Sequence, residues 1–103
     1  MTIARFRVHD SSIVGFTIQG HSGYAKAGED IVCSAVSSAA YLTINTLVDI
    51  FSQEAKIDCR DGFMSFYLNK GSQTAGDILE GLRQHLSALS EQYPQFLKVY
   101  SEV

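Results

Sequence analysis

Two segments of the chain alternate apolar and polar residues as β-hairpins do. From Thr2 to Val8, arginines alternate with apolar residues, which predicts a strand with one buried face. Residues 9–12 form turns readily, and the apolar alternation returns from Val14 to Ile18. We therefore expect the first two elements to be a pair of strands joined by a tight turn.

The second alternating segment runs from Ala55 to Leu68. Apolar and charged residues alternate up to Cys59, and Asp61-Gly62 is a strong signal for a two-residue hairpin turn. The alternation resumes at Met64. This pattern predicts a second hairpin, in which Cys59 is on the core-facing side.

Two other segments have the period of an α-helix. We predict a first helix from Asp30, as N-cap, to about Ser52, and a second from near Ser72 to Pro94. A last short strand is expected over residues 96–101. The apolar stripes are Val32, Val36, Ala39, Thr43, Leu47 and Ile50 in the first helix, and Ala75, Leu79, Leu82, Leu86, Leu89 and Tyr93 in the second.

The predicted order of elements is ββαββαβ. Because hairpins dominate this order, we expect an α+β fold with a mostly antiparallel sheet and two helices packed on it. A chain of 103 residues has the usual size of one domain, so residues 1–103 are expected to form a single domain.

Charge and cysteine content narrow the classes of function. The chain has 8 basic and 11 acidic residues without a basic cluster, which argues against nucleic acid as the main partner. Two cysteines are too few for a disulfide framework, and the N-terminus has no apolar signal core, so we expect a cytoplasmic protein.

Residues 31–48 carry no charge and have about the length of a membrane span, but they contain several serines and threonines. A buried helix is the better interpretation, and no membrane partner is expected.

The segment from Gly20 to Ser37 contains the candidate chemistry. Residues 20–28 hold three glycines and no apolar period, which predicts a loop. His21 would follow the end of a strand, and Cys33 would lie in the first turn of the first helix. The unpaired N–H groups at a helix N-terminus stabilise a thiolate and can bind the oxyanion that forms when it attacks an amide. A histidine nearby can accept the thiol proton and return it to the leaving amine. Both residues also have an ordinary explanation, since a cysteine is often a small core residue and a histidine a polar loop residue.

The same segment closely resembles the signature of the ribosomal-processing cysteine protease (Prp) family. The resemblance includes His21, Gly28, Asp30, Cys33 and Ser37 at the family's spacing, and it extends over nearly the whole chain. It implies a cysteine endopeptidase without cofactor or metal, with Cys33 as nucleophile and His21 as base. It further implies a homodimer that removes the N-terminal extension of large-subunit ribosomal protein number twenty-seven, and so a role in ribosome assembly.

The neighbours of the dyad have two interpretations each. Asp30 either caps the helix or orients His21, although its charge beside Cys33 would oppose thiolate formation. Ser37, one turn after Cys33, either bonds a group of the site or allows close packing. The loop residues expected near substrate are Gly20, Ser22, Gly23 and Gly28, whose glycines also have a purely conformational explanation.

Two other functions remain possible from the sequence. A non-catalytic ribosome-associated binding module of the same fold would not need the thiol of Cys33. A thiol-redox protein would pair Cys33 with Cys59, although the chain has no Cys-x-x-Cys motif.

Overall fold

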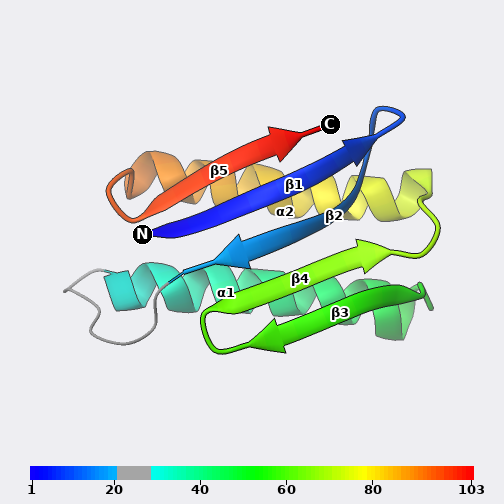
Figure 1. Ribbon diagram of the computed structural model, residues 1–103, viewed down its shortest axis with the longest axis horizontal. Coiled ribbons are helices and arrows are strands. Elements are labelled where there is room, and N and C mark those ends of the chain that lie inside the picture. The colour runs from blue at the N-terminus through cyan, green and yellow to red at the C-terminus, as the bar shows by residue number, and fades with distance from the viewer. Residues whose placement is uncertain (21–28) are drawn as a thin grey trace.

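The computed structural model describes residues 1–20 and 29–103. These residues form a sheet with two helices packed on one of its faces (Figure 1). In chain order the elements are β1 (Thr2–His9), β2 (Ser12–Gln19), α1 (Glu29–Asn45), the π-helical turn η1 (Thr46–Ile50), β3 (Ala55–Arg60), β4 (Phe63–Leu68), α2 (Gln73–Gln92) and β5 (Leu97–Glu102). The predicted order ββαββαβ and the α+β class are confirmed.

The described strands form a five-stranded sheet in the order β3-β4-β2-β1-β5. Neighbouring strands are antiparallel except β1 and β5, which are parallel. A parallel neighbour requires a crossover connection, and α2 supplies it by running back across the sheet before β5 begins (Figure 1).

Both hairpin turns use the positive-φ backbone that a tight turn between twisted strands requires. Asp10 and Ser11 have φ of 52° and 64°, and Gly62 has φ of 74°. Positive φ at the centre of a two-residue turn matches the right-handed twist of the strands that it joins. The two predicted hairpins are therefore confirmed, together with their turn residues.

A β-bulge changes which residues of the first hairpin face the helices. The register shifts between Arg7 and Val8, so that Val8 pairs with Ile13 while Arg7 pairs with Gly15. The extra residue, Val14, reverses the alternation in this part of β2. As a result Ile13 is buried, while Val14 is only half-buried.

The core lies between the sheet and the two helices. Phe6, Phe16 and Phe66 come from three adjacent strands and are fully buried, with ring centroids 5.8 and 5.7 Å apart. The helices cover these rings with aliphatic side chains, which include Val32, Val36, Ala40, Ile44, Leu47, Ala75, Leu79, Leu82 and Leu86.

The first helix differs from its prediction at both ends. It begins at Glu29, so Asp30 is its second residue and not the expected N-cap. At its other end the chain continues as η1, whose wider turn shifts the phase of the apolar stripe. Ile50, predicted to be buried, is consequently 72% exposed.

The second helix follows its prediction closely. Ser72 is the N-cap, and its hydroxyl accepts a hydrogen bond of 3.1 Å from the backbone N–H of Ala75. The stripe from Ala75 to Leu86 is buried, and Tyr93 at the C-cap is half-buried. The helix ends immediately before Pro94, which cannot continue it.

Strand β3 is at the edge of the sheet, and this corrects the prediction for Cys59. The residue is exposed, as is Ile57 at 46% exposure, although their alternation predicted a core-facing side. Alternation indicates which residues share a face, but at an edge strand that face can extend beyond the helices. Here it forms one wall of a cleft.

One described stretch, Ile31–Ile50, is apolar and long enough to cross a membrane by length and composition, and 33% of its most apolar window is buried. Its buried residues, among them Val32, Val36 and Leu47, pack against the sheet. This arrangement fits the predicted core helix, but the opposite face of the helix is exposed.

Candidate active site

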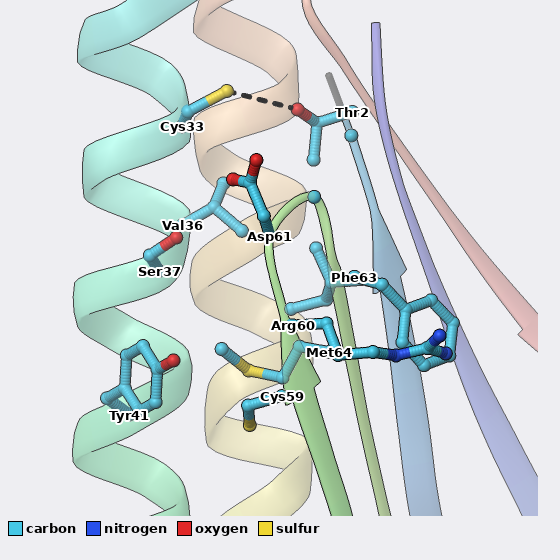
Figure 2. Close-up of a pocket in the computed structure, with 13 residues that line it drawn as sticks. Thr2, Cys33, Val36, Ser37, Tyr41, Cys59, Arg60, Asp61, Phe63 and Met64 are labelled. Atoms are coloured by element: carbon cyan, nitrogen blue, oxygen red, sulfur yellow. Dashed lines mark hydrogen bonds between the residues drawn. The ribbon is translucent and has the colours of Figure 1, made fainter. Parts of the chain in front are cut away.

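A cleft of about 410 Å³ separates the N-terminal half of α1 from the turn between β3 and β4 (Figure 2). It lies beside the point where β2 ends. Its described lining is Cys33, Val36, Ser37 and Tyr41 from α1, residues 59–64 from the hairpin, and Thr2, Ile18 and Gly20 from the ends of β1 and β2.

Cys33 occupies the fifth position of α1, is half-buried and lines this cleft. Because the Cα–Cβ bonds of a helix tilt toward its N-terminus, the sulfur lies over the preceding turn, where the unpaired backbone N–H groups are. The Sγ atom is 3.5 Å from Oγ1 of Thr2 (Figure 2). The thiol therefore lies between a helix N-terminus and a buried hydroxyl group.

Ser37 and Tyr41 follow Cys33 at intervals of four residues, so all three share the helix face that lines the cleft. Tyr41 is 47% exposed, and the side chain of Cys59 faces it across the cleft (Figure 2). Repulsion between the Cys59 thiolate and the phenolate raises the pKa of Tyr41 above its usual value, and burial raises it further. Tyr41 therefore contributes a neutral phenol to this end of the cleft at neutral pH.

The positions of the two cysteines argue against the redox alternative. No disulfide joins Cys33 and Cys59. Figure 2 shows Cys59 on the hairpin opposite Tyr41, which is eight residues after Cys33 and therefore about 12 Å farther along the helix. A disulfide requires Cα atoms within about 7 Å, so this placement does not favour a bond between the two cysteines.

The hairpin turn is attached to the end of β2 by one backbone hydrogen bond. The N–H of Gly20 donates to the carbonyl of Gly62 at 3.0 Å. This bond fixes the β3–β4 turn beside the strand end that precedes His21. The wall of the cleft that this turn forms is therefore anchored to the sheet.

The structure brings together three of the residues predicted for the site, namely Cys33, Ser37 and Gly20. His21, Ser22, Gly23 and Gly28 lie outside the described residues. Asp30 is on the same turn of α1 as Cys33, as its sequence position requires, but at the second helical position. In the described chain, no group of three or more His, Cys, Asp or Glu side chains could hold a metal ion.

Sequence reasoning missed Thr2, Tyr41 and the hairpin residues of the cleft. Thr2 did carry a signal, because a polar residue occupies a position in phase with the buried residues Ala4 and Phe6. A polar side chain at a buried position commonly has a specific partner. Tyr41 carried no comparable signal, because it lies outside the apolar stripe and its partner is distant in sequence.

Residues 1–98 match the model of a family described as cysteine protease Prp. The chain belongs to this family. It is therefore a cysteine protease, as the resemblance of its motif implied.

Known relatives cover nearly the whole chain. The ribosomal processing cysteine protease Prp of Bacillus subtilis is 25% identical over an alignment of 104 positions, which covers 94% of this chain and 93% of the relative. The protein of the same name from Staphylococcus aureus is 20% identical, with coverage of 87% of this chain and 88% of its own length.

Solved structures share the fold. A ribosomal processing protease from S. aureus in complex with a substrate peptide has a TM-score of 0.90 at 20% identity, and the match covers 99% of this chain and 100% of that one. The same protease with a covalently linked product peptide has a TM-score of 0.86 at 21% identity, with the same coverage. A protein from Streptococcus mutans has a TM-score of 0.83 at 24% identity, covering 98% of this chain and 93% of that one.

Proposed function

We propose that this protease uses Cys33 as its nucleophile and His21 as its base to remove the N-terminal extension of a ribosomal protein. The observation that best supports the proposal is the position of Cys33 near the N-terminal end of α1, in the lining of a cleft of about 410 Å³. Cys59 also lines this cleft, but it lies on an edge strand without a helix N-terminus beside it.

The reaction follows from this arrangement. His21 accepts the thiol proton, and the Cys33 thiolate attacks the scissile carbonyl carbon. Backbone N–H groups in the first turn of α1 bind the oxyanion of the tetrahedral intermediate. The imidazolium gives its proton to the leaving amine, which leaves an acyl-enzyme with a thioester at Cys33. Water, deprotonated by His21, hydrolyses the thioester and restores the thiol.

The substrate assignment rests on the family. The curated relatives are named ribosomal processing proteases, and the S. aureus protease binds a substrate peptide. Our specific proposal for the target is large-subunit ribosomal protein number twenty-seven. A net charge of −3 suits the basic body of a ribosomal protein, and the cytoplasm is the compartment in which that protein is assembled into ribosomes.

The proposal is tested with a peptide that spans the junction between the extension and the mature protein. We expect the reduced enzyme to cut this peptide once, at the junction, and to leave a peptide of the same composition in scrambled order intact. Mass spectrometry identifies the cut. If the enzyme cleaves other peptides but not this one, the ribosomal target is wrong while the protease assignment stands.

A binding module of the same fold is the alternative that the sequence left open. It has no need of a thiol, so binding of the ribosomal protein would be its only measurable property. Cleavage by the wild-type protein that is lost with His21→Ala excludes it, provided that the variant is folded and still binds the peptide.

We further propose that the protease acts as a homodimer joined through the outer face of α1. Ile31 and Leu42 on this helix are 65% and 69% exposed. A groove of about 580 Å³ runs between α1 and α2 and is lined by small and apolar residues, including Ala35, Ala39, Leu42, Gly81 and Leu82. Small side chains at such a groove let a second helix approach closely, so a second copy of the chain is the proposed occupant.

Sedimentation analysis of two variants tests this interface. Leu42→Glu introduces a charge inside the groove and is expected to shift the protein to monomer. Ile50→Glu alters an equally apolar residue, 72% exposed, that does not line the groove, and it is expected to leave the dimer intact. A wild-type protein that sediments as a monomer at micromolar concentrations would contradict the proposal.

A further inference from the structure

Thr2 is a polar residue in an otherwise apolar part of the core. It is 3% exposed, and its neighbours on the same face of β1, Ala4 and Phe6, are completely buried. A hydroxyl group buried to this extent is costly unless it has a hydrogen-bond partner. Its Oγ1 atom is hydrogen-bonded to the Sγ atom of Cys33 at 3.5 Å, and Figure 2 shows the two side chains pointing toward each other.

The backbone of Thr2 is held on the side away from Cys33. Its N–H donates to the carbonyl of Phe96 at 2.8 Å, and Thr2 is paired with Leu97 in the parallel ladder between β1 and β5. Its β-branched side chain also has few allowed rotamers. The hydroxyl of Thr2 is therefore fixed in place by the sheet.

Gly20 closes the space on the other side of the Thr2 side chain. A Cβ atom at Gly20 would lie 2.6 Å from Oγ1, 3.2 Å from Cβ and 3.3 Å from Cγ2 of Thr2. Since the added Cβ atom would be too close to all three of these atoms, rotation about χ1 of Thr2 could not relieve the clash. Gly20, interpreted from the sequence as a source of backbone freedom, is thus required for close approach and does not have a positive φ.

We propose that Thr2 is a positioning residue for the nucleophile, an assignment that rests on Cys33 being that nucleophile. In the neutral site either the thiol or the hydroxyl can donate. Once the thiol proton has moved to the base, the sulfur has no proton, so within this pair only the hydroxyl of Thr2 can donate. Thr2 keeps its own proton throughout, and its hydrogen bond both orients the thiolate and stabilises its charge.

This contact favours catalysis on balance. Stabilising a thiolate increases the fraction of enzyme in the reactive form but lowers the reactivity of each thiolate, with a Brønsted coefficient of about 0.4–0.5. The gain in population therefore exceeds the loss in reactivity wherever the thiol is mainly protonated. In addition, a sulfur held at a fixed position against β1 needs no reorientation before attack.

The test measures alkylation of Cys33 by iodoacetamide in a Cys59→Ala background, across a range of pH. Thr2→Val replaces the hydroxyl with a methyl group of similar size, and it is expected to move the midpoint of the rate–pH profile to higher pH. The alkylation rate at neutral pH should fall about threefold to tenfold, because the thiolate fraction falls while its reactivity rises. Thr2→Ser retains the hydroxyl and should restore the midpoint. Thr17→Val is the matched control, because Thr17 belongs to β2 on the opposite face of the sheet from the buried Phe16.

Gly20→Ala provides a second variant. It retains the hydroxyl group of Thr2 but displaces it, because the added Cβ atom would clash with that side chain. It is expected to shift the midpoint in the same direction as Thr2→Val, and the two changes together should have no more effect than either alone. A Thr2→Val midpoint equal to that of the wild type, or a shift that Thr2→Ser fails to reverse, would overturn the proposal. Because alkylation requires no peptide substrate, this test is independent of whether the protease acts on a ribosomal protein.

Discussion

Replacing Cys33 by alanine is expected to abolish peptide cleavage. The proposed reaction forms and then hydrolyses a thioester at this sulfur, and no other described thiol lies at a helix N-terminus. Loss of a protease nucleophile lowers kcat by about 10⁶-fold, so the variant should have no activity above the background of the assay. Hydrolysis of the junction peptide, followed by mass spectrometry, measures this loss.

Cys59→Ala is the matched control, because it removes a second thiol from the same cleft. It deletes one small side chain from a region expected to contact substrate, and such a change reduces kcat/KM by about tenfold at most. Both variants must be shown to be folded, for which circular dichroism suffices. If Cys59→Ala abolished cleavage and Cys33→Ala retained it, the assignment of the nucleophile would be reversed.

Replacing Phe16 by alanine is expected to have the largest effect on stability. The ring is completely buried at the centre of the sheet, and it contacts Phe6 at 5.8 Å and Phe66 at 5.7 Å between ring centroids. Removing such a ring leaves a cavity between the sheet and the helices and costs about 3–5 kcal/mol. Since a domain of this size has a total stability of about 5–15 kcal/mol, the variant should be barely stable at best. Urea denaturation followed by circular dichroism measures the free energy of unfolding.

Phe51→Ala is the appropriate comparison for Phe16→Ala. Phe51 follows η1 and is 44% exposed, so its removal creates no closed cavity. We expect a loss of no more than about 1.5 kcal/mol for this variant. Equal losses for the two phenylalanines would show that the packed rings of β1, β2 and β4 are not the centre of the core.

The parts of the fold that depend on neighbouring residues could be predicted from the sequence. Asp61-Gly62 identified its hairpin because the turn requires a positive φ that glycine readily adopts, and Ser72 identified the start of α2 because a helix needs an acceptor at its N-cap. The family motif around Cys33 identified the protease class, which the comparison with the family confirmed.

The errors occurred where a residue's environment depends on distant parts of the chain. The exposure of Cys59 follows from the position of β3 at the sheet edge, which alternation does not encode. Ile50 is exposed because a π-helical turn changed the helical phase without an obvious sequence signal. The roles of Thr2 and Tyr41 depend on contacts between residues that are far apart along the chain, 31 positions in the case of Thr2 and Cys33.

The candidate site shows the same division. Cys33 could be proposed as its nucleophile from local sequence, because a helix N-terminus and the family motif are local features. Its substrate cleft could not, because it forms only when β2, the β3–β4 turn and α1 are brought together, with the hydrogen bond from Gly20 to Gly62 holding two of these elements.

The central claim is that covalent chemistry occurs at Cys33, and the most direct measurement is to identify the residue that becomes acylated. A junction peptide with an electrophilic group in place of the scissile bond would be incubated with the enzyme, and the modified residue located by mass spectrometry of a digest. We predict one adduct per chain, on Cys33, which is absent from Cys33→Ala and still formed by Cys59→Ala. An adduct on Cys59, or modification that is equally rapid with a scrambled peptide, would contradict the account.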